Sequence, residues 1–152
     1  RGTDDLVKRV IGLPGDRIQM RGGRLIVNGE IVARELVGEY RYRERDGRIV
    51  AVVEYRETLP GGRSHQILEV SDRGMADNTP VYTVPAGHLF MLGDNRDNSG
   101  DSRFLDDVGY VPMDRLLGRA DLVAFSWSGC MQEPDLACPG GLWGDRLMRG
   151  LR

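Results

Sequence analysis

The stretch "RIQMRGGRLIVNGEIVA", residues 17–33, decides the fold class of this chain. Its apolar runs are short, and glycine-containing turns at 21–23 and 28–29 separate them. Asn-Gly between alternating apolar residues is the strongest short-range signal for a β-hairpin, because both residues tolerate the positive φ angles of a tight turn. We therefore predict consecutive antiparallel hairpins here and a mainly β fold.

Further strand and turn signals extend in both directions from this stretch. A second hairpin signal, Asp46–Gly47, joins the alternating run 39–45 to the apolar run 48–57. Additional short strands are predicted at "HQILEV" (65–70), within "VYTVPAGHLFML" (81–92), at "GYVP" (109–112) and at "RADLVAFSW" (119–127), with a helical turn near "MDRLLG" (113–118). In the tail, residues 142–152 space apolar side chains four apart beside arginines, which fits a short basic amphipathic helix.

The composition is that of an ordinary globular domain, with 40% apolar and 29% charged residues among 152. The net charge of −2 gives no basic field, so we expect no nucleic acid partner. The apolar runs are far too short to cross a bilayer, and no signal peptide is apparent. Because the chain begins with Arg1, we expect it to be part of a longer protein.

A polar stretch, "GDNRDNSGDSR" at residues 93–103, lies between two apolar runs and could be a solvated loop, a metal site or a catalytic scaffold. A calcium loop that begins at Asp97 requires glycine at its sixth position and glutamate at its twelfth, where Ser102 and Val108 stand. The arginines of the stretch would also repel a cation. We therefore predict no metal and no cofactor.

A serine–histidine–aspartate hydrolase is a second possibility, for which His65 and His88 could supply the imidazole. No G-x-S-x-G nucleophile elbow exists, so we favour structural roles for both histidines. The two cysteines, Cys130 and Cys138, are too few for a zinc site. A disulfide between them and two free thiols are equally compatible with the sequence.

Lysine is almost absent, since Lys8 is the one lysine among 21 cationic residues. Lysine, unlike arginine, can lose its proton in a protein when its surroundings disfavour charge. Lys8 stands in the apolar run 6–13, and burial among such side chains lowers a lysine pKa toward the roughly 7–8 that a general base needs. A serine–lysine dyad is therefore a third possibility. The alternative is that Lys8 has no special role and remained a lysine by chance in an arginine-rich chain.

Two segments, "KRVIGLPGD" (8–16) and "GDNRDNSGDSR" (93–103), followed by "GYVP" (109–112), resemble in sequence and in order the signature boxes of bacterial type I signal peptidase, the leader peptidase. The resemblance is weak over 30–80 and 127–152. It implies a membrane-bound serine endopeptidase that removes signal peptides from exported preproteins by a Ser/Lys dyad, without a metal. It also implies an upstream anchor in the plasma (inner) membrane, with the catalytic domain on the extracytoplasmic or periplasmic side.

The resemblance assigns roles to residues of both boxes. It implies that Lys8 is the general base and that Ser99 hydrogen-bonds the lysine amine and orients it. Val7 is implied to line the substrate pocket, and Asp101 and Arg103 to form an ion pair that shapes the loop. The remaining supporting residues are Arg9, Asp94, Asn95, Arg96 and Asp97.

The implied architecture is a signal-peptidase-like antiparallel β fold, in which residues 1–16 and 86–152 form the catalytic core and residues 17–85 an inserted β subdomain. The family's nucleophile lies in a serine–x–methionine–proline motif just after the anchor, and no such motif occurs here. We therefore predict that this chain carries the base but not the nucleophile and is inactive alone. The alternatives are Ser99 as nucleophile, a non-catalytic peptide-binding β module, and a self-cleaving Ser/Lys peptidase of the LexA-like repressor type.

Overall fold

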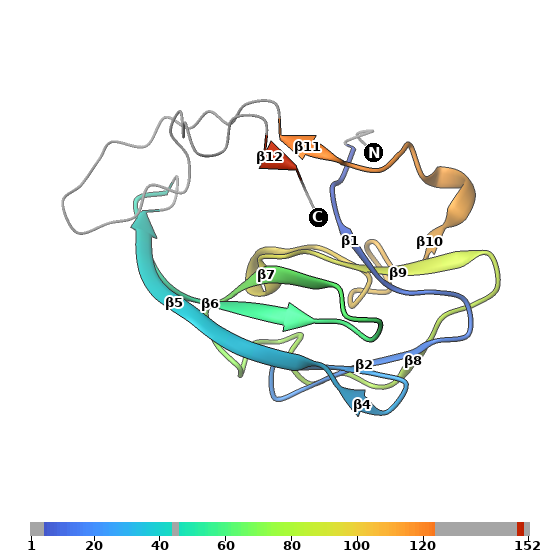
Figure 1. The fold of residues 1–152 in the computed structure, drawn as a ribbon, viewed down its shortest axis with the longest axis horizontal. Helices are drawn as coiled ribbons and strands as arrows, with labels where there is room; N and C mark the ends of the chain where they lie inside the picture. The colour runs from blue at the N-terminus through green and yellow to red at the C-terminus, as the bar shows by residue number, and fades with distance from the viewer. Residues whose placement is uncertain (1–4, 44–45, 124–148, 151–152) are drawn as a thin grey trace.

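The computed structural model describes residues 5–43, 46–123 and 149–150, and it is built almost entirely of short antiparallel strands (Figure 1). The predicted mainly β fold is confirmed. Within the described residues, the helical content consists of two short 3-10 turns, η1 (Arg96–Asn98) and η2 (Met113–Arg115). None of the helices in these described ranges has the length and apolar character needed to traverse a bilayer.

The stretch 17–33 forms most of a four-stranded sheet. Its order is β4 (Glu30–Ile31), β3 (Arg24–Val27), β2 (Arg17–Arg21) and β8 (Tyr82–Thr83), and all neighbours are antiparallel. The turn between β3 and β4 holds Asn28 at a φ of 54°, a left-handed conformation that asparagine tolerates better than most residues. The predicted hairpins are confirmed, and β8 joins them from a segment distant in sequence.

A second sheet is formed by β5 (Ala33–Arg43), β6 (Ile49–Thr58) and β7 (Ser64–Glu69), in that order. β5 and β6 pair along nearly their whole length and curve together in Figure 1. The hairpin predicted at Asp46–Gly47 is therefore confirmed. β7 pairs with β6 on one side and turns its other edge toward the loop at 93–103.

The third sheet brings the two sequence boxes together. It contains β1 (Arg9–Gly12), β9 (His88–Leu92) and β10 (Val111–Pro112), with β9 in the middle. Lys8 immediately precedes β1, and β9 leads directly into the loop at 93–103. Because β1 and β9 are antiparallel neighbours, the start of β1 lies beside the end of β9, where this loop begins.

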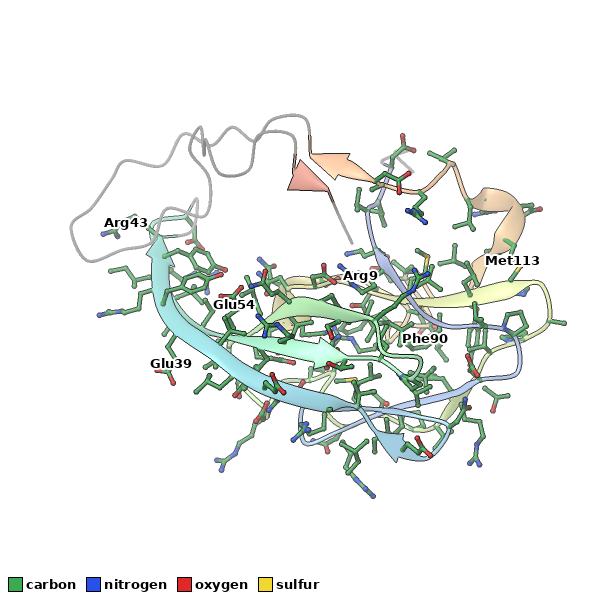
Figure 2. The ribbon with its side chains drawn as sticks, in the orientation of Figure 1. Arg9, Glu39, Arg43, Glu54, Phe90 and Met113 are labelled. Carbon is green, nitrogen blue, oxygen red and sulfur yellow. The ribbon has the colours of Figure 1, made fainter. Side chains whose placement is uncertain are left out.

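One apolar cluster joins the first and third sheets. Phe90 of β9 is buried between its own strand and the sheet of β2 and β8 (Figure 2), with its ring centroid 5.1 Å from that of Tyr82. The cluster comprises Ile11, Ile18, Met20, Leu25, Val27, Val32, Tyr82, Val84, Phe90 and Leu92. Its members come from both the proposed insert, residues 17–85, and the proposed core, so the two segments share a hydrophobic interior.

A fourth, two-stranded sheet pairs β11 (Leu122–Val123) with β12 (Arg149–Gly150). The helix predicted over 142–152 is wrong at Arg149–Gly150. Pairing with β11 competes there with a helix, which glycine supports poorly. The rest of that helix and the residues Cys130 and Cys138 lie outside the described residues.

Candidate active site

The two boxes meet at a hydrogen bond between Lys8 and Ser99. The Nζ atom of Lys8 donates to Oγ of Ser99 at 2.7 Å, across a separation of 91 residues. Lys8 stands immediately before β1, and Ser99 stands immediately after η1. Both side chains are half-buried, so the pair remains accessible to solvent.

Gly93 makes this contact sterically possible. It joins β9 to the loop, and a Cβ atom placed on it would lie 2.1 Å from Oγ of Ser99 and 3.5 Å from Nζ of Lys8. Any side chain at this position would therefore displace Ser99. The sequence analysis missed this requirement, because a glycine before Asp94 resembles an ordinary turn residue until its spatial neighbours are known.

A buried ion pair fixes the loop behind Ser99. Arg103 donates from Nε to Oδ1 of Asp101 at 2.8 Å and from Nη2 to Oδ2 at 2.9 Å. Asp101 also accepts the Gly93 N–H at 3.1 Å, and Arg103 also donates to the carbonyl oxygen of Arg96 at 2.5 Å. Burial raises the pKa of Asp101, but the hydrogen bond and charge of Arg103 outweigh burial and lower the pKa below its ordinary value. The ionised pair thus links the start, middle and end of the loop.

A second ion pair holds β1 against the loop. Arg9, the residue after Lys8, donates from Nε to Oδ1 of Asp94 at 2.7 Å and from Nη2 to Oδ2 at 2.8 Å. Two parallel hydrogen bonds between a guanidinium and a carboxylate restrict both distance and orientation. The pair therefore limits how far Lys8 can move from the loop that holds Ser99.

A third pair joins the loop to β6. Arg96 donates from Nη1 to Oε1 of Glu57 at 3.0 Å, its Nη2 contacts Oε2, and both side chains are buried. Nε2 of His65 lies 3.5 Å from Oε2 of Glu57. Burial raises the pKa of Glu57, but the contacts with His65 and Arg96 outweigh burial and bring the pKa to about 2. Glu57 was not predicted, because a glutamate at the end of a mixed strand gives no sign that it is buried.

The loop is also docked on the backbone of β7 and the residues that follow it. The N–H of Leu68 donates to the carbonyl oxygen of Asp94 at 2.8 Å. The N–H groups of Val70 and Ser71 donate to Oδ2 of Asp97 at 2.7 and 2.9 Å. The segment that carries Ser99 is therefore held by the proposed insert as well as by the strands beside it.

Comparison with known proteins places the chain in a family. The model of the family "Signal peptidase, peptidase S26" matches residues 1–126. The chain belongs to the signal peptidase family. This membership agrees with the resemblance of the two boxes, which contain Lys8 and Ser99.

Individual relatives carry the name signal peptidase I. The protein of Pseudomonas aeruginosa is 43% identical over 129 residues, which cover 80% of this chain and 43% of that protein. The protein of Pseudomonas fluorescens is 40% identical over 139 residues, covering 86% and 45%. The protein of Rickettsia typhi is 38% identical over 126 residues, covering 79% and 46%. The chain thus spans less than half the length of these relatives.

The surroundings of Lys8 in this signal peptidase chain differ from one expectation. Leu6, Val7 and Val10 are exposed, so the prediction that neighbouring apolar side chains bury Lys8 is wrong for these three. Leu6 and Val7 precede the sheet, because the strand starts only at Arg9. Asn95, the other supporting residue, forms a backbone bridge with Leu68.

In the described structure, both histidines contact groups other than Lys8 and Ser99. His65 is buried beside Glu57, and Nδ1 of His88 lies 2.9 Å from the carbonyl oxygen of Ala86. These partners fit the structural roles that the sequence analysis favoured over a serine–histidine–aspartate hydrolase.

Proposed function

We propose that this chain is the base-bearing catalytic region of a signal peptidase I, a serine endopeptidase that works by a Ser/Lys dyad. The observation that carries the proposal is the 2.7 Å hydrogen bond from Nζ of Lys8 to Oγ of Ser99, in a member of the signal peptidase family. Lys8 is the general base in this proposal, and Ser99 orients it. The ion pairs of Arg9, Arg96 and Arg103 hold the two residues in place.

The general base acts in its neutral form. A neutral amine can donate one N–H to Ser99 while its lone pair points at a second hydroxyl group. That hydroxyl attacks the carbonyl carbon of the scissile peptide as its proton moves to Nζ of Lys8. The resulting ammonium protonates the leaving amine, and a water molecule then hydrolyses the acyl-enzyme by the same route.

The attacking serine is proposed to lie outside residues 1–152. Within the described part of the chain, the hydroxyl groups of Ser64, Ser71 and Ser102 form hydrogen bonds with residues other than Lys8. Ser99 is the hydroxyl that Lys8 contacts there, and its bond to the amine suits an orienting role. The chain alone is therefore expected to be inactive.

The proposed substrate is the signal peptide of an exported preprotein, bound in an extended conformation. Among the described strands, β1 lies at the edge of its sheet, and an edge strand can pair with an added extended peptide. Val7, just before β1, is 82% exposed and can contact a small substrate side chain. The proposed location is the plasma (inner) membrane, with an upstream anchor and this region on the extracytoplasmic side. No cofactor and no nucleic acid take part.

Cleavage of a preprotein by the natural full-length protein tests this proposal. We expect the wild-type protein to cleave, and Lys8→Ala and Lys8→Arg to lower kcat/KM by about 10²–10⁴-fold, the usual contribution of a general base. Lys8→Arg is the sharper variant because arginine keeps the charge but does not deprotonate. Arg63→Ala, on an exposed loop, is the control and should leave kcat/KM unchanged.

Equal cleavage by wild type and Lys8→Arg would refute the base assignment. Ser99→Ala should retain part of the activity, since an orienting residue forms no covalent bond; an activity as low as that of a nucleophile deletion would make Ser99 the nucleophile instead. Binding of preproteins without cleavage would favour the peptide-binding module. Cleavage restricted to the protein's own chain would favour the LexA-like peptidase.

A further inference from the structure

The junction between the second sheet and the loop at 93–103 contains more carboxylates than the arginines that pair with them. Four arginines there form ion pairs with carboxylates. The pairs are Arg9 with Asp94, Arg34 with Asp72, Arg96 with Glu57, and Arg103 with Asp101. Three further carboxylates, those of Glu69, Asp77 and Asp97, remain beside these pairs, and they are the three that converge.

Glu69, Asp77 and Asp97 form the one such acidic cluster found among the described residues. One ligand atom from each lies within 4.8 Å of the others. Glu69 is 2% exposed and Asp77 is 0% exposed, whereas Asp97 is open to solvent. The cluster is therefore accessible from solvent on the side of Asp97.

The buried members of this cluster are not satisfied by the described protein groups. Both carboxylate oxygens of Glu69 and Oδ1 of Asp77 are buried without a hydrogen-bond partner. Arg34 forms an ion pair with Glu69, but its Nη1 lies 3.9 Å from Oε1 of Glu69, too far for a hydrogen bond, and Arg34 donates its hydrogen bonds to Asp72 instead. Burying a carboxylate without hydrogen bonds costs free energy, and a bound cation would offset this cost.

Neighbouring backbone N–H groups hold two of the carboxylates in place. Oδ2 of Asp97 accepts the N–H groups of Val70 and Ser71, and Oδ2 of Asp77 accepts the N–H of Gly74. Gly74 itself borders the cluster. A Cβ atom placed on it would lie 2.8 Å from Oδ1 of Asp97 and 3.2 Å from Oδ2 of Asp77, so a side chain there would intrude between the two.

We propose that Glu69, Asp77 and Asp97 bind one divalent cation of the hard, oxygen-preferring class, Ca²⁺ above all, as a structural ion between the second sheet and the loop. Ca²⁺ takes carboxylate oxygens at about 2.3–2.6 Å, which places adjacent ligands ~3.4 Å apart and opposite ligands ~4.8 Å apart. The three ligand atoms lie within 4.8 Å of one another, so none is farther from another than opposite Ca²⁺ ligands are. Water reaching the exposed Asp97 completes the coordination shell.

Burial and mutual repulsion disfavour negative charge on the carboxylates of the cluster. Burial, together with Asp97 and Asp77, raises the pKa of Glu69 to about 8, and Arg96 and Arg34 offset this only in part. Burial also raises the pKa of Asp77. The calcium pattern excluded from the sequence assumed ligands from one continuous loop, whereas Glu69 and Asp77 come from the segment that the loop docks against.

The ion is distinct from the proposed dyad, and its test needs no proteolytic activity. Chain 1–152 is freed of metal with a chelator and titrated calorimetrically with CaCl₂ or MgCl₂ alone, and its thermal unfolding is followed in parallel. We expect one Ca²⁺ per chain and, at ten times the dissociation constant, a rise in Tm of about 3–6 °C. Glu69→Gln should lose both the binding and the rise in Tm.

Glu69→Gln should also keep or increase the Tm measured in chelator, because glutamine is similar in size and never carries the charge that burial disfavours; this separates loss of the ion from loss of the fold. Asp77→Asn is the second ligand variant, and Asp106→Asn, at an exposed carboxylate, is the control that should bind like wild type. The proposal is overturned if neither ion binds at roughly 10 mM, above the weakest protein Ca²⁺ sites at ~10⁻³ M, or if both ligand variants bind Ca²⁺ as wild type does.

Discussion

At the scale of single residues, Gly93 is the most restrictive position of the site, because an added Cβ would lie 2.1 Å from Oγ of Ser99. We expect Gly93→Ala to lower kcat/KM of the full-length protein by about 10²-fold, the usual cost of displacing a catalytic group by ~1 Å. Preprotein cleavage measures this. Gly118→Ala, where an added Cβ meets no atom within 4 Å, is the matched control. Unchanged cleavage by Gly93→Ala would mean that the contact of Lys8 with Ser99 does not govern the rate.

The ion pairs of Asp101 and Asp94 differ in burial, and we expect their loss to differ in energy. Asp101→Asn leaves the buried Arg103 without its counter-charge and should lower the free energy of unfolding by about 3–5 kcal/mol. Asp94→Asn breaks a partly exposed pair and should cost about 0–1 kcal/mol. Urea unfolding of chain 1–152 compares the two. Equal losses would show that burial does not set the strength of these pairs.

At the scale of the elements, the sequence predicted hairpins well because their signals are local. The turns at Asn28–Gly29 and Asp46–Gly47 specify positive φ angles within two residues, and the strands on either side follow. The tail helix failed at Arg149–Gly150 because pairing with β11 depends on a segment distant in sequence. Hairpins can therefore be predicted from local sequence, whereas the pairing partner of a short isolated strand cannot, because it lies far away in the sequence.

Glu57 on β6 should make a pH-dependent contribution to stability, since its pKa is about 2 in the folded chain and ordinarily 4.5. The stabilisation is complete above about pH 4.5 and disappears as the pH falls toward 2, because the unfolded chain takes up the proton first. The difference corresponds to about 3 kcal/mol. Urea unfolding from about pH 6 down to pH 3 should show this slope.

Glu57→Gln should lose that part of the pH dependence and should also be less stable near neutrality, because Arg96 stays buried without its carboxylate. Glu39→Gln is the control, since Glu39 is exposed and points outward from β5 (Figure 2). A pH profile of Glu57→Gln parallel to that of wild type would mean that another carboxyl group carries the acid sensitivity.

At the scale of the whole molecule, the boxes contain the residues proposed for the site but do not show what holds them. Lys8, Ser99 and the pair of Asp101 and Arg103 lie within two short motifs, so a resemblance could name them. Glu57 and the docking of the loop on β7 are contacts between segments far apart in sequence. Sequence patterns describe neighbouring residues and do not report such long-range contacts, which become visible only when the sheets are arranged in space.

The shared core predicts that the sheet of β1, β9 and β10 and the sheet of β4, β3, β2 and β8 unfold together. Phe90→Ala removes a fully buried ring and should lower the free energy of unfolding by about 3–5 kcal/mol. Because Phe90 packs on Tyr82 and belongs to the cluster that includes β2 and β3, amide protons of β2, β3 and β9 should all exchange faster by a similar factor. Val52→Ala, at a buried position of β6 outside this cluster, is the control for cavity formation in the second sheet. If β2 and β3 kept their wild-type protection while β9 lost its own, the sheet of β2 and β3 would be stable independently of the sheet that contains β9.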